Sequence, residues 1–176
     1  MLFPGGSGSG QAKELRAEGR DAVRAFVRGG GGYVGVCAGA YLASAGYSWS
    51  LGLLDAVVID RAHWARGVGS VDLSWTAAGR EKVSIGRESQ TVRYANGPLY
   101  APAKVATIPD FEVWATYASE MNKNDAPQGV MLDTPAVIYG RFGSGHVVGI
   151  SPHPEQTADS EEITRHLVRR AAGAKH

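Results

Sequence analysis

The sequence predicts a single α/β domain that spans residues 1–176 and contains an antiparallel extension. Two observations lead to this class. The first 45 residues follow the order helix, short buried strand and helix, whereas residues 68–150 hold several strand-like segments divided by Gly and Pro turns. A chain of 176 residues is also long enough for one substantial core and short for two.

The amino-terminal elements surround two glycine-rich loops. Residues 2–3 are expected to form the stub of a strand, and a loop follows at 4–10. A helix is predicted over 11–28, because apolar residues recur at helical spacing and a glycine cluster follows them. These apolar residues are Leu15, Ala22, Val23, Phe26 and Val27. Residues 33–36 then predict a buried strand, and residues 38–45 predict a helix of small residues packed closely against it.

The rest of the chain is predicted to be mainly strands. Two apolar segments, 136–142 and 146–150, flank Gly143-Ser144-Gly145, which is typical of a β-hairpin with a glycine-containing loop. A closing helix is predicted over 161–172. Earlier strands are predicted at 68–75, 91–94, 103–108 and 112–117.

Composition and charge make several classes of function unfavourable. The chain carries 18 basic and 17 acidic side chains, so a nucleic-acid partner is not expected. Neither an apolar run of membrane-spanning length nor a signal-type amino terminus is seen, and the cytoplasm is the expected location. A single cysteine forms no internal disulfide and no multi-thiolate zinc site, and the five histidines are not clustered. We therefore expect neither a metal nor a cofactor.

Two glycine-rich segments resemble nucleotide-binding loops but lack the neighbouring elements or residues that nucleotide binding requires. Residues 30–35 fit G-x-G-x-x-G, but they follow a helix and precede a strand, which reverses the order that dinucleotide binding requires. The loop after Pro4 lacks the Gly-Lys-Ser/Thr ending of a triphosphate cradle. A nucleotide ligand is therefore not expected.

Cys37 lies in the motif Gly35-x-Cys37-x-Gly39, between a predicted strand and a predicted helix. This is the context of a nucleophile elbow, in which a sharp turn exposes the nucleophile and requires small neighbours. A helix N-terminus also favours negative charge on the sulfur. The alternative is an inert cysteine buried as a small apolar residue.

His153 follows the last predicted strand in the segment Ser151-Pro152-His153-Pro154-Glu155. It is expected at the carboxyl end of that strand, where the active sites of α/β proteins gather. His153 can serve as the base for a thiol nucleophile, and Glu155 can orient the imidazole. The alternative is a solvated histidine in a loop.

Three segments, "FPGGSGSG", "GVCAGAY" and "SPHPEQT", resemble the class I glutamine amidotransferase-like superfamily. Within it, "RGVGSVDL", "YANGPLY" and "YGRFGSGHVVGISPHPE" are most similar to the biotin-protein ligase N-terminal-domain-like family. The resemblance implies a flavodoxin-like, mostly parallel sheet flanked by helices, and a triad of Cys37, His153 and Glu155. It also implies an oxyanion hole formed by the main-chain N–H groups of Gly5, Gly6 and Ala38.

The sequence departs from the superfamily pattern in two places. Glutaminase domains commonly carry Gly-His-Gln where this chain has Gly39-Ala40-Tyr41, which makes glutamine a less favoured substrate. Family members usually have a strand, a helix and a second strand before the Pro-Gly-Gly loop, whereas only residues 1–3 precede it here. We therefore expect the first strand-helix unit to be missing, and a second copy or a partner to cover the exposed sheet edge.

Three functions are compatible with these features. The favoured one is a cysteine-dependent amidase or amidotransferase-like hydrolase that acts on a small amide. The alternatives are a non-catalytic regulatory or ligand-binding domain, and a peptidase in which Asp110, Glu112 or Arg61 positions a peptide terminus. Specificity is expected to lie in the loops 61–69 and 94–102. Candidate substrate contacts are Tyr41, Trp64, Asn96 and Tyr100.

Overall fold

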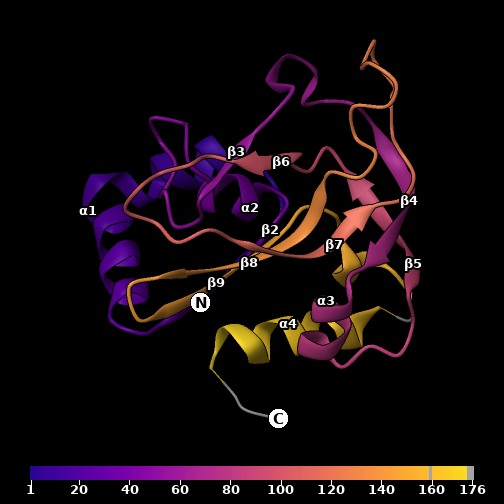
Figure 1. Cartoon of the computed structure of the whole chain (residues 1–176). Coiled ribbons are helices and arrows are strands. Elements are labelled where there is room, and N and C mark those ends of the chain that lie inside the picture. The colour runs from indigo at the N-terminus through magenta and orange to yellow at the C-terminus, as the bar shows by residue number, and fades with distance from the viewer. Residues whose placement is uncertain (159, 174–176) are drawn as a thin grey trace.

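A seven-stranded sheet forms the centre of the molecule, with helices packed against both of its faces (Figure 1). The computed structural model describes residues 1–158 and 160–173. In chain order the elements are β1 (Leu2–Phe3), α1 (Gly8–Arg28), β2 (Gly32–Val36), α2 (Ala38–Ala43), β3 (Ala56–Val58), η1 (Arg61–His63), β4 (Val68–Trp75), α3 (Ala77–Val83), β5 (Ser89–Ala95), β6 (Tyr100–Pro102), β7 (Glu112–Tyr117), β8 (Pro135–Phe142), β9 (Gly145–Ile150), η2 (Pro154–Gln156) and α4 (Glu161–Ala171).

The sheet is parallel at one end and antiparallel at the other. Its strand order is β1-β2-β9-β8-β7-β4-β5. Parallel pairing joins β1, β2 and β9, whereas the pairs from β9 through β5 are antiparallel. The α/β class, the antiparallel extension and the β8–β9 hairpin are thereby confirmed. The antiparallel part is larger than the sequence predicts, because every strand from β4 to β9 except the short β6 joins this one sheet.

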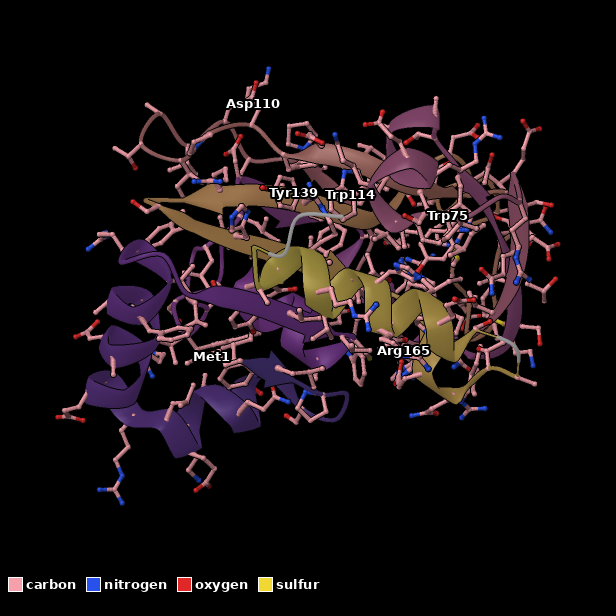
Figure 2. The ribbon with its side chains drawn as sticks, turned by 90° about the horizontal axis from the view of Figure 1, so that it is seen from below. Met1, Trp75, Asp110, Trp114, Tyr139 and Arg165 are labelled. Carbon is pink, nitrogen blue, oxygen red and sulfur yellow. The ribbon has the colours of Figure 1, made fainter. Side chains whose placement is uncertain are left out.

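Alternate residues of the central strands face two separate apolar cores. Tyr33 and Val147 pack with residues of α1 and α2, whereas their neighbours Val34 and Val148 pack with residues of α3 and α4. Burial on both faces explains why β2 and β9 are apolar along nearly their whole length. Figure 2 shows α4 lying across the second face, which also carries the stacked rings of Trp114 and Tyr139.

The helices differ in detail from the prediction. Helix α1 begins three residues earlier than expected, because the Ser7 side chain caps it by accepting the Gly10 N–H at 3.0 Å. It is kinked at Arg16, whose φ is 57°. Helix α2 ends at Ala43 instead of Ala45. In the part of the chain that the structure describes, no helix is long and apolar enough to cross a bilayer.

The predicted strand at 103–108 is wrong. The strand lies earlier, as β6, and pairs with β3 in a separate two-stranded sheet. The next residues curl around Asp55, whose backbone and side-chain oxygens accept the N–H groups of Ala103 and Val105. Lys104, with φ at 59°, breaks the extended conformation between them. The sequence also did not predict α3 or β3.

Candidate active site

Cys37 occupies a sharp turn between β2 and α2. Its backbone is at φ 49° and ψ −99°, a conformation that costs a non-glycine residue roughly 1–3 kcal/mol. The surrounding fold holds this conformation, since the Cys37 N–H donates to the Ile150 carbonyl at 2.8 Å. A Cβ on Gly35 would lie 2.3 Å from the Gly39 carbonyl oxygen, and a Cβ on Gly39 would lie 2.2 Å from that of Phe3. The predicted need for small residues around Cys37 therefore has a direct steric cause.

His153 is buried beside Cys37, at the carboxyl end of β9. The side chain of Glu155 reaches back to the imidazole, with its Oε1 2.7 Å from Nδ1. Burial lowers the pKa of His153, but hydrogen bonds to Cys37 and Glu155, together with their charges, outweigh burial and raise this pKa from 6.5 to about 9. The structure thus brings Cys37, His153 and Glu155 together in the predicted order.

Strand β5 holds both sides of this arrangement in place. The His153 N–H donates to the Arg93 carbonyl at 2.7 Å, and the Cys37 thiol donates to the Ala95 carbonyl at 3.4 Å. The Thr157 hydroxyl accepts the Arg93 N–H and donates to the His153 carbonyl, each at 2.9 Å. The sequence did not predict this role of β5, because its contacts use backbone carbonyls, which every residue has.

The Pro-Gly-Gly loop lies directly over the imidazole. The Pro4 carbonyl accepts the Gly39 N–H at 3.2 Å, which fixes the loop on α2. Gly6 and Cys37 line the same cavity. Ala38 is the first residue of α2, where N–H groups have no partner within the helix. Gly5, Gly6 and Ala38 therefore all lie around Cys37 and His153, and their role as oxyanion donors stays a prediction.

In a mechanism that uses His153 as the base, Gly5→Ala is expected to lower kcat/KM about 100-fold while the protein still folds. A Cβ at this position would lie 2.7 Å from Cε1 of His153, so the added methyl group pushes the buried ring out of place. Turnover and circular dichroism together measure this effect. The matched control is Gly86→Ala, where a Cβ meets no atom within 4 Å. Equal activity of Gly5→Ala and the control would contradict the placement.

A cavity of about 430 Å³ opens beside Cys37. Tyr41 and Asn96 line it, as predicted, and the Tyr41 hydroxyl donates to the Asn96 carbonyl at 3.2 Å. Tyr100 is not among its lining residues; it is 1% exposed and belongs to the core on the α1–α2 side. The full lining is Gly6, Ser7, Gly8, Ser9, Cys37, Tyr41, Tyr47, Trp49, Arg61, Trp64, Ala95 and Asn96.

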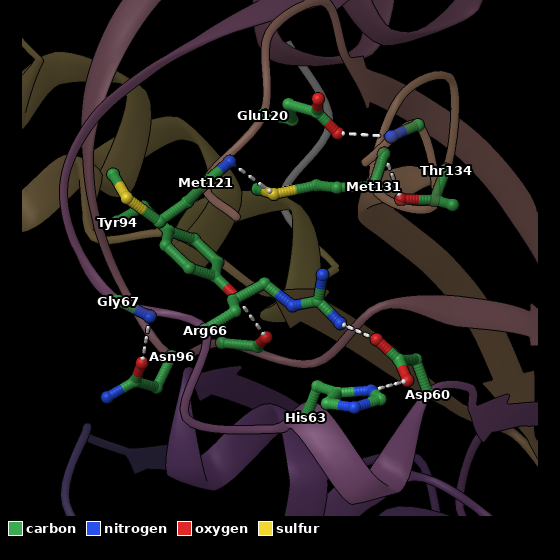
Figure 3. Close-up of polar contacts among 12 residues, drawn as sticks. Asp60, His63, Arg66, Gly67, Tyr94, Asn96, Glu120, Met121, Met131 and Thr134 are labelled. Carbon is green, nitrogen blue, oxygen red and sulfur yellow. Dashed lines mark hydrogen bonds and ion pairs between the residues drawn. The ribbon is translucent and has the colours of Figure 1, made fainter. Parts of the chain in front are cut away.

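An ion pair between the buried Arg66 and the partly buried Asp60 (Figure 3) anchors the segment that carries Arg61 and Trp64. Arg66 is 1% exposed and pairs with Asp60 at 2.5 Å, while His63 contacts the other oxygen of the same carboxylate at 2.6 Å. Burial alone raises the pKa of Asp60, but these hydrogen bonds and charges outweigh it and lower the pKa. Nothing in the sequence pattern singled out Arg66.

The residues suggested for a peptidase do not gather at Cys37. Arg61 lines the cavity, but Asp110 lies at the edge of the molecule in Figure 2 and is not among the lining residues. Glu112 accepts a hydrogen bond from the Trp114 indole at 3.1 Å on β7. Among the described residues, no group of three or more His, Cys, Asp and Glu side chains is placed to hold a metal ion.

Comparisons with known proteins agree with the predicted resemblance. The profile of the family described as "Biotin-protein ligase, N terminal" matches residues 1–63. No curated protein matches the chain. PurLQS from Thermotoga maritima is similar in structure, with a TM-score of 0.64, 18% identity, and coverage of 96% of this chain and 79% of that one.

Two further solved structures share the fold. A putative GMP synthase component from Thermoplasma acidophilum has a TM-score of 0.55 and 16% identity, covering 98% of this chain and 72% of its own. β-Galactosidase from Bacillus circulans sp. alkalophilus has a TM-score of 0.53 and 14% identity, covering 99% of this chain and 22% of its own. These likenesses show that the chain shares the α/β fold of these proteins, as the sequence predicted.

Proposed function

We propose that this chain is a cysteine-dependent amidase or amidotransferase-like hydrolase that cleaves a small amide through a thioester. The observation that carries the proposal is the position of His153, buried between the Cys37 sulfur and the Glu155 carboxylate. Covalent acyl transfer requires a nucleophile next to a base, and a third group that orients the base. The cavity beside Cys37 gives a small substrate access to the sulfur.

The first step is attack of the Cys37 thiolate on the amide carbonyl carbon. Negative charge develops on the carbonyl oxygen, and the N–H groups of Gly5, Gly6 and Ala38 are the proposed donors to it. The C–N bond then breaks, and the His153 imidazolium gives its proton to the leaving nitrogen. The products of this half-reaction are a free amine and a thioester on Cys37.

Thioester formation prepares His153 for the second step. The charge of Cys37 is one cause of the raised pKa of His153, and acylation removes that charge. The imidazole therefore holds its proton less tightly and can take one from water. The water oxygen bonds to the acyl carbon, the carboxylic acid leaves, and the thiolate–imidazolium pair is restored.

The value of kcat/KM is expected to fall above about pH 9, where His153 loses the proton that the leaving amine needs. Because Glu155 raises the pKa of His153, Glu155→Gln lowers this pKa and moves the alkaline limb to lower pH. Titration of the imidazole signals by NMR measures the pKa without a substrate. An unchanged pKa in Glu155→Gln would contradict the orienting role.

The rate of iodoacetamide labelling tests the activated thiol before any substrate is known. Cys37 is the only cysteine, so each added mass reports this residue alone. At pH 6 we expect the wild type to react about tenfold faster than His153→Ala, because the imidazolium stabilises negative charge on the sulfur. His166→Gln, on α4, is the matched control and should react like the wild type. Equal, slow labelling of all three proteins would contradict the proposal that Cys37 is an activated nucleophile.

A second candidate is a non-catalytic regulatory or ligand-binding domain. It is favoured by the profile match over residues 1–63, and by the likeness to a β-galactosidase of which the chain covers only 22%. One fold hosts many unrelated functions, so the likeness to a β-galactosidase does not indicate that this chain has that activity. A ligand whose affinity is the same in the wild type and Cys37→Ala, together with slow labelling, would favour this candidate over the amidase.

A further inference from the structure

The cavity beside Cys37 is lined by aromatic side chains and by side chains that can donate hydrogen bonds. Tyr41, Tyr47, Trp49 and Trp64 supply four of its lining residues. A volume of about 430 Å³ suits a small molecule with one ring. Planar aromatic walls favour a ligand with a flat apolar group, because offset-stacked and edge-to-face contacts between rings add to the burial of apolar area.

Arg61 is a fixed cation in this cavity. Its Nε donates to the Val58 carbonyl and its Nη1 to the Gly46 carbonyl, each at 3.0 Å. The guanidinium lies over the Tyr47 ring, 4.2 Å from the centroid. Within the described residues, Nη2 donates to no partner. A guanidinium held by two carbonyls and a ring is ordered in advance for a carboxylate.

The other groups around Arg61 also favour an anion. Asn96 accepts the Gly67 N–H with its Oδ1 at 2.8 Å (Figure 3). Its NH₂ group is left as a donor at the cavity that Asn96 lines. Among the described residues that line the cavity, none is Asp or Glu. The cavity therefore offers uncommitted donors and one positive charge, without a carboxylate to repel a negative ligand.

Trp64 supplies an open aromatic face next to this cation. It is 57% exposed and takes part in no aromatic pair among the described residues. Arg61 begins η1 and Trp64 directly follows it, and the ion pair between Asp60 and the buried Arg66 holds this segment in place. A large indole kept in water at the edge of a cavity is typical of a ligand contact.

We propose that the substrate of this site is a small amide that carries both an aromatic ring and a carboxylate, a statement that rests on the proposed function. The ring stacks on Trp64, and the carboxylate pairs with Nη2 of Arg61. The reaction forms a bond from sulfur to the carbonyl carbon and breaks the C–N bond, while the amine takes its proton from His153. Water then hydrolyses the thioester, so the net change is amide plus water to acid plus amine.

Binding of three probes to Cys37→Ala tests the proposal without turnover. N-benzoylglycine has both the ring and the carboxylate, N-benzoylglycinamide lacks the charge, and N-acetylglycine lacks the ring. Calorimetry is expected to show that N-benzoylglycine binds at least about tenfold tighter than either of the others. Equal affinity for all three probes would overturn the proposal.

Two further substitutions in the Cys37→Ala background assign each preference to a residue. Arg61→Gln should remove the preference over N-benzoylglycinamide and leave the preference over N-acetylglycine, and Trp64→Ala should do the reverse. Arg87→Gln changes an exposed arginine outside the cavity and should keep both preferences. Retention of both preferences in Arg61→Gln and Trp64→Ala would overturn the assignment.

Turnover by the wild type separates this inference from the proposed function. If the probes bind with the expected preferences but the wild type hydrolyses no amide in a mixed panel, recognition stands and the amidase proposal fails. If the wild type hydrolyses aliphatic, uncharged amides as fast as N-benzoylglycine, the amidase proposal stands and the aromatic carboxylate preference is wrong.

Discussion

Cys37→Ala is expected to lower kcat/KM for amide hydrolysis by about 10⁴-fold, with little change in folding. The proposed mechanism routes the acyl group through the sulfur, and alanine leaves no atom that can form the thioester. The buried side chain loses only one heavy atom, so circular dichroism and the midpoint of chemical unfolding should stay close to the wild type. Product release by the wild type and the variant, measured on the same amide, gives the ratio.

The double variant Cys37→Ala/His153→Ala sharpens this test. Groups that act as one unit give losses that do not add, so the double variant should be about as slow as the slower single variant. Losses that multiply would mean that Cys37 and His153 act independently, which contradicts the shared mechanism. His166→Gln again serves as the control histidine on α4 and should keep full activity.

Gly35→Ala is expected to destabilise the protein by about 3 kcal/mol or more. The added Cβ would lie 2.3 Å from the carbonyl oxygen of Gly39 and 2.8 Å from the backbone N of Ala40. These are backbone atoms of α2, so no side chain can rotate away, and the helix must move off β2. The loss is a large share of a typical stability of about 5–15 kcal/mol.

Urea unfolding followed by fluorescence measures this change, and Gly86→Ala is again the control. That residue has open space where the methyl group would be added and no positive φ, so its stability should stay within about 0.5 kcal/mol of the wild type or increase slightly. A Gly35→Ala protein as stable as this control would show that α2 can move away from β2 without a loss in the free energy of unfolding. The steric account of the turn at Cys37 would then be wrong.

The sequence predicted the turn at Cys37 and the position of His153 because both depend on local patterns. Small residues between a strand and a helix indicate close backbone contact, and the structure shows this contact between Gly35 and Gly39. Strand β4 was predicted with its observed bounds, since its residues alternate between buried and exposed as a half-covered strand requires.

Features that depend on distant contacts were not predictable in this way. Helix α3 is short and contains Gly79, which looks unfavourable for a helix until its contact with the Trp114 carbonyl on β7 is known. Tyr47 and Trp49 come from a loop without periodicity, so nothing local places them at the cavity. Tyr100 was expected at the cavity because it lies within 94–102, a predicted specificity loop, but β6 directs it into the core.

Strand β5 makes the surroundings of Cys37 depend on the synthesis of later segments. Cys37 leaves the ribosome early, whereas its contacts with the Ala95 carbonyl and with His153 come from segments synthesised much later. His153 in turn needs the Arg93 carbonyl of β5 to hold its backbone. A nascent or misfolded chain therefore carries a thiol without its imidazole, so the proposed thiol chemistry requires a molecule that has finished folding.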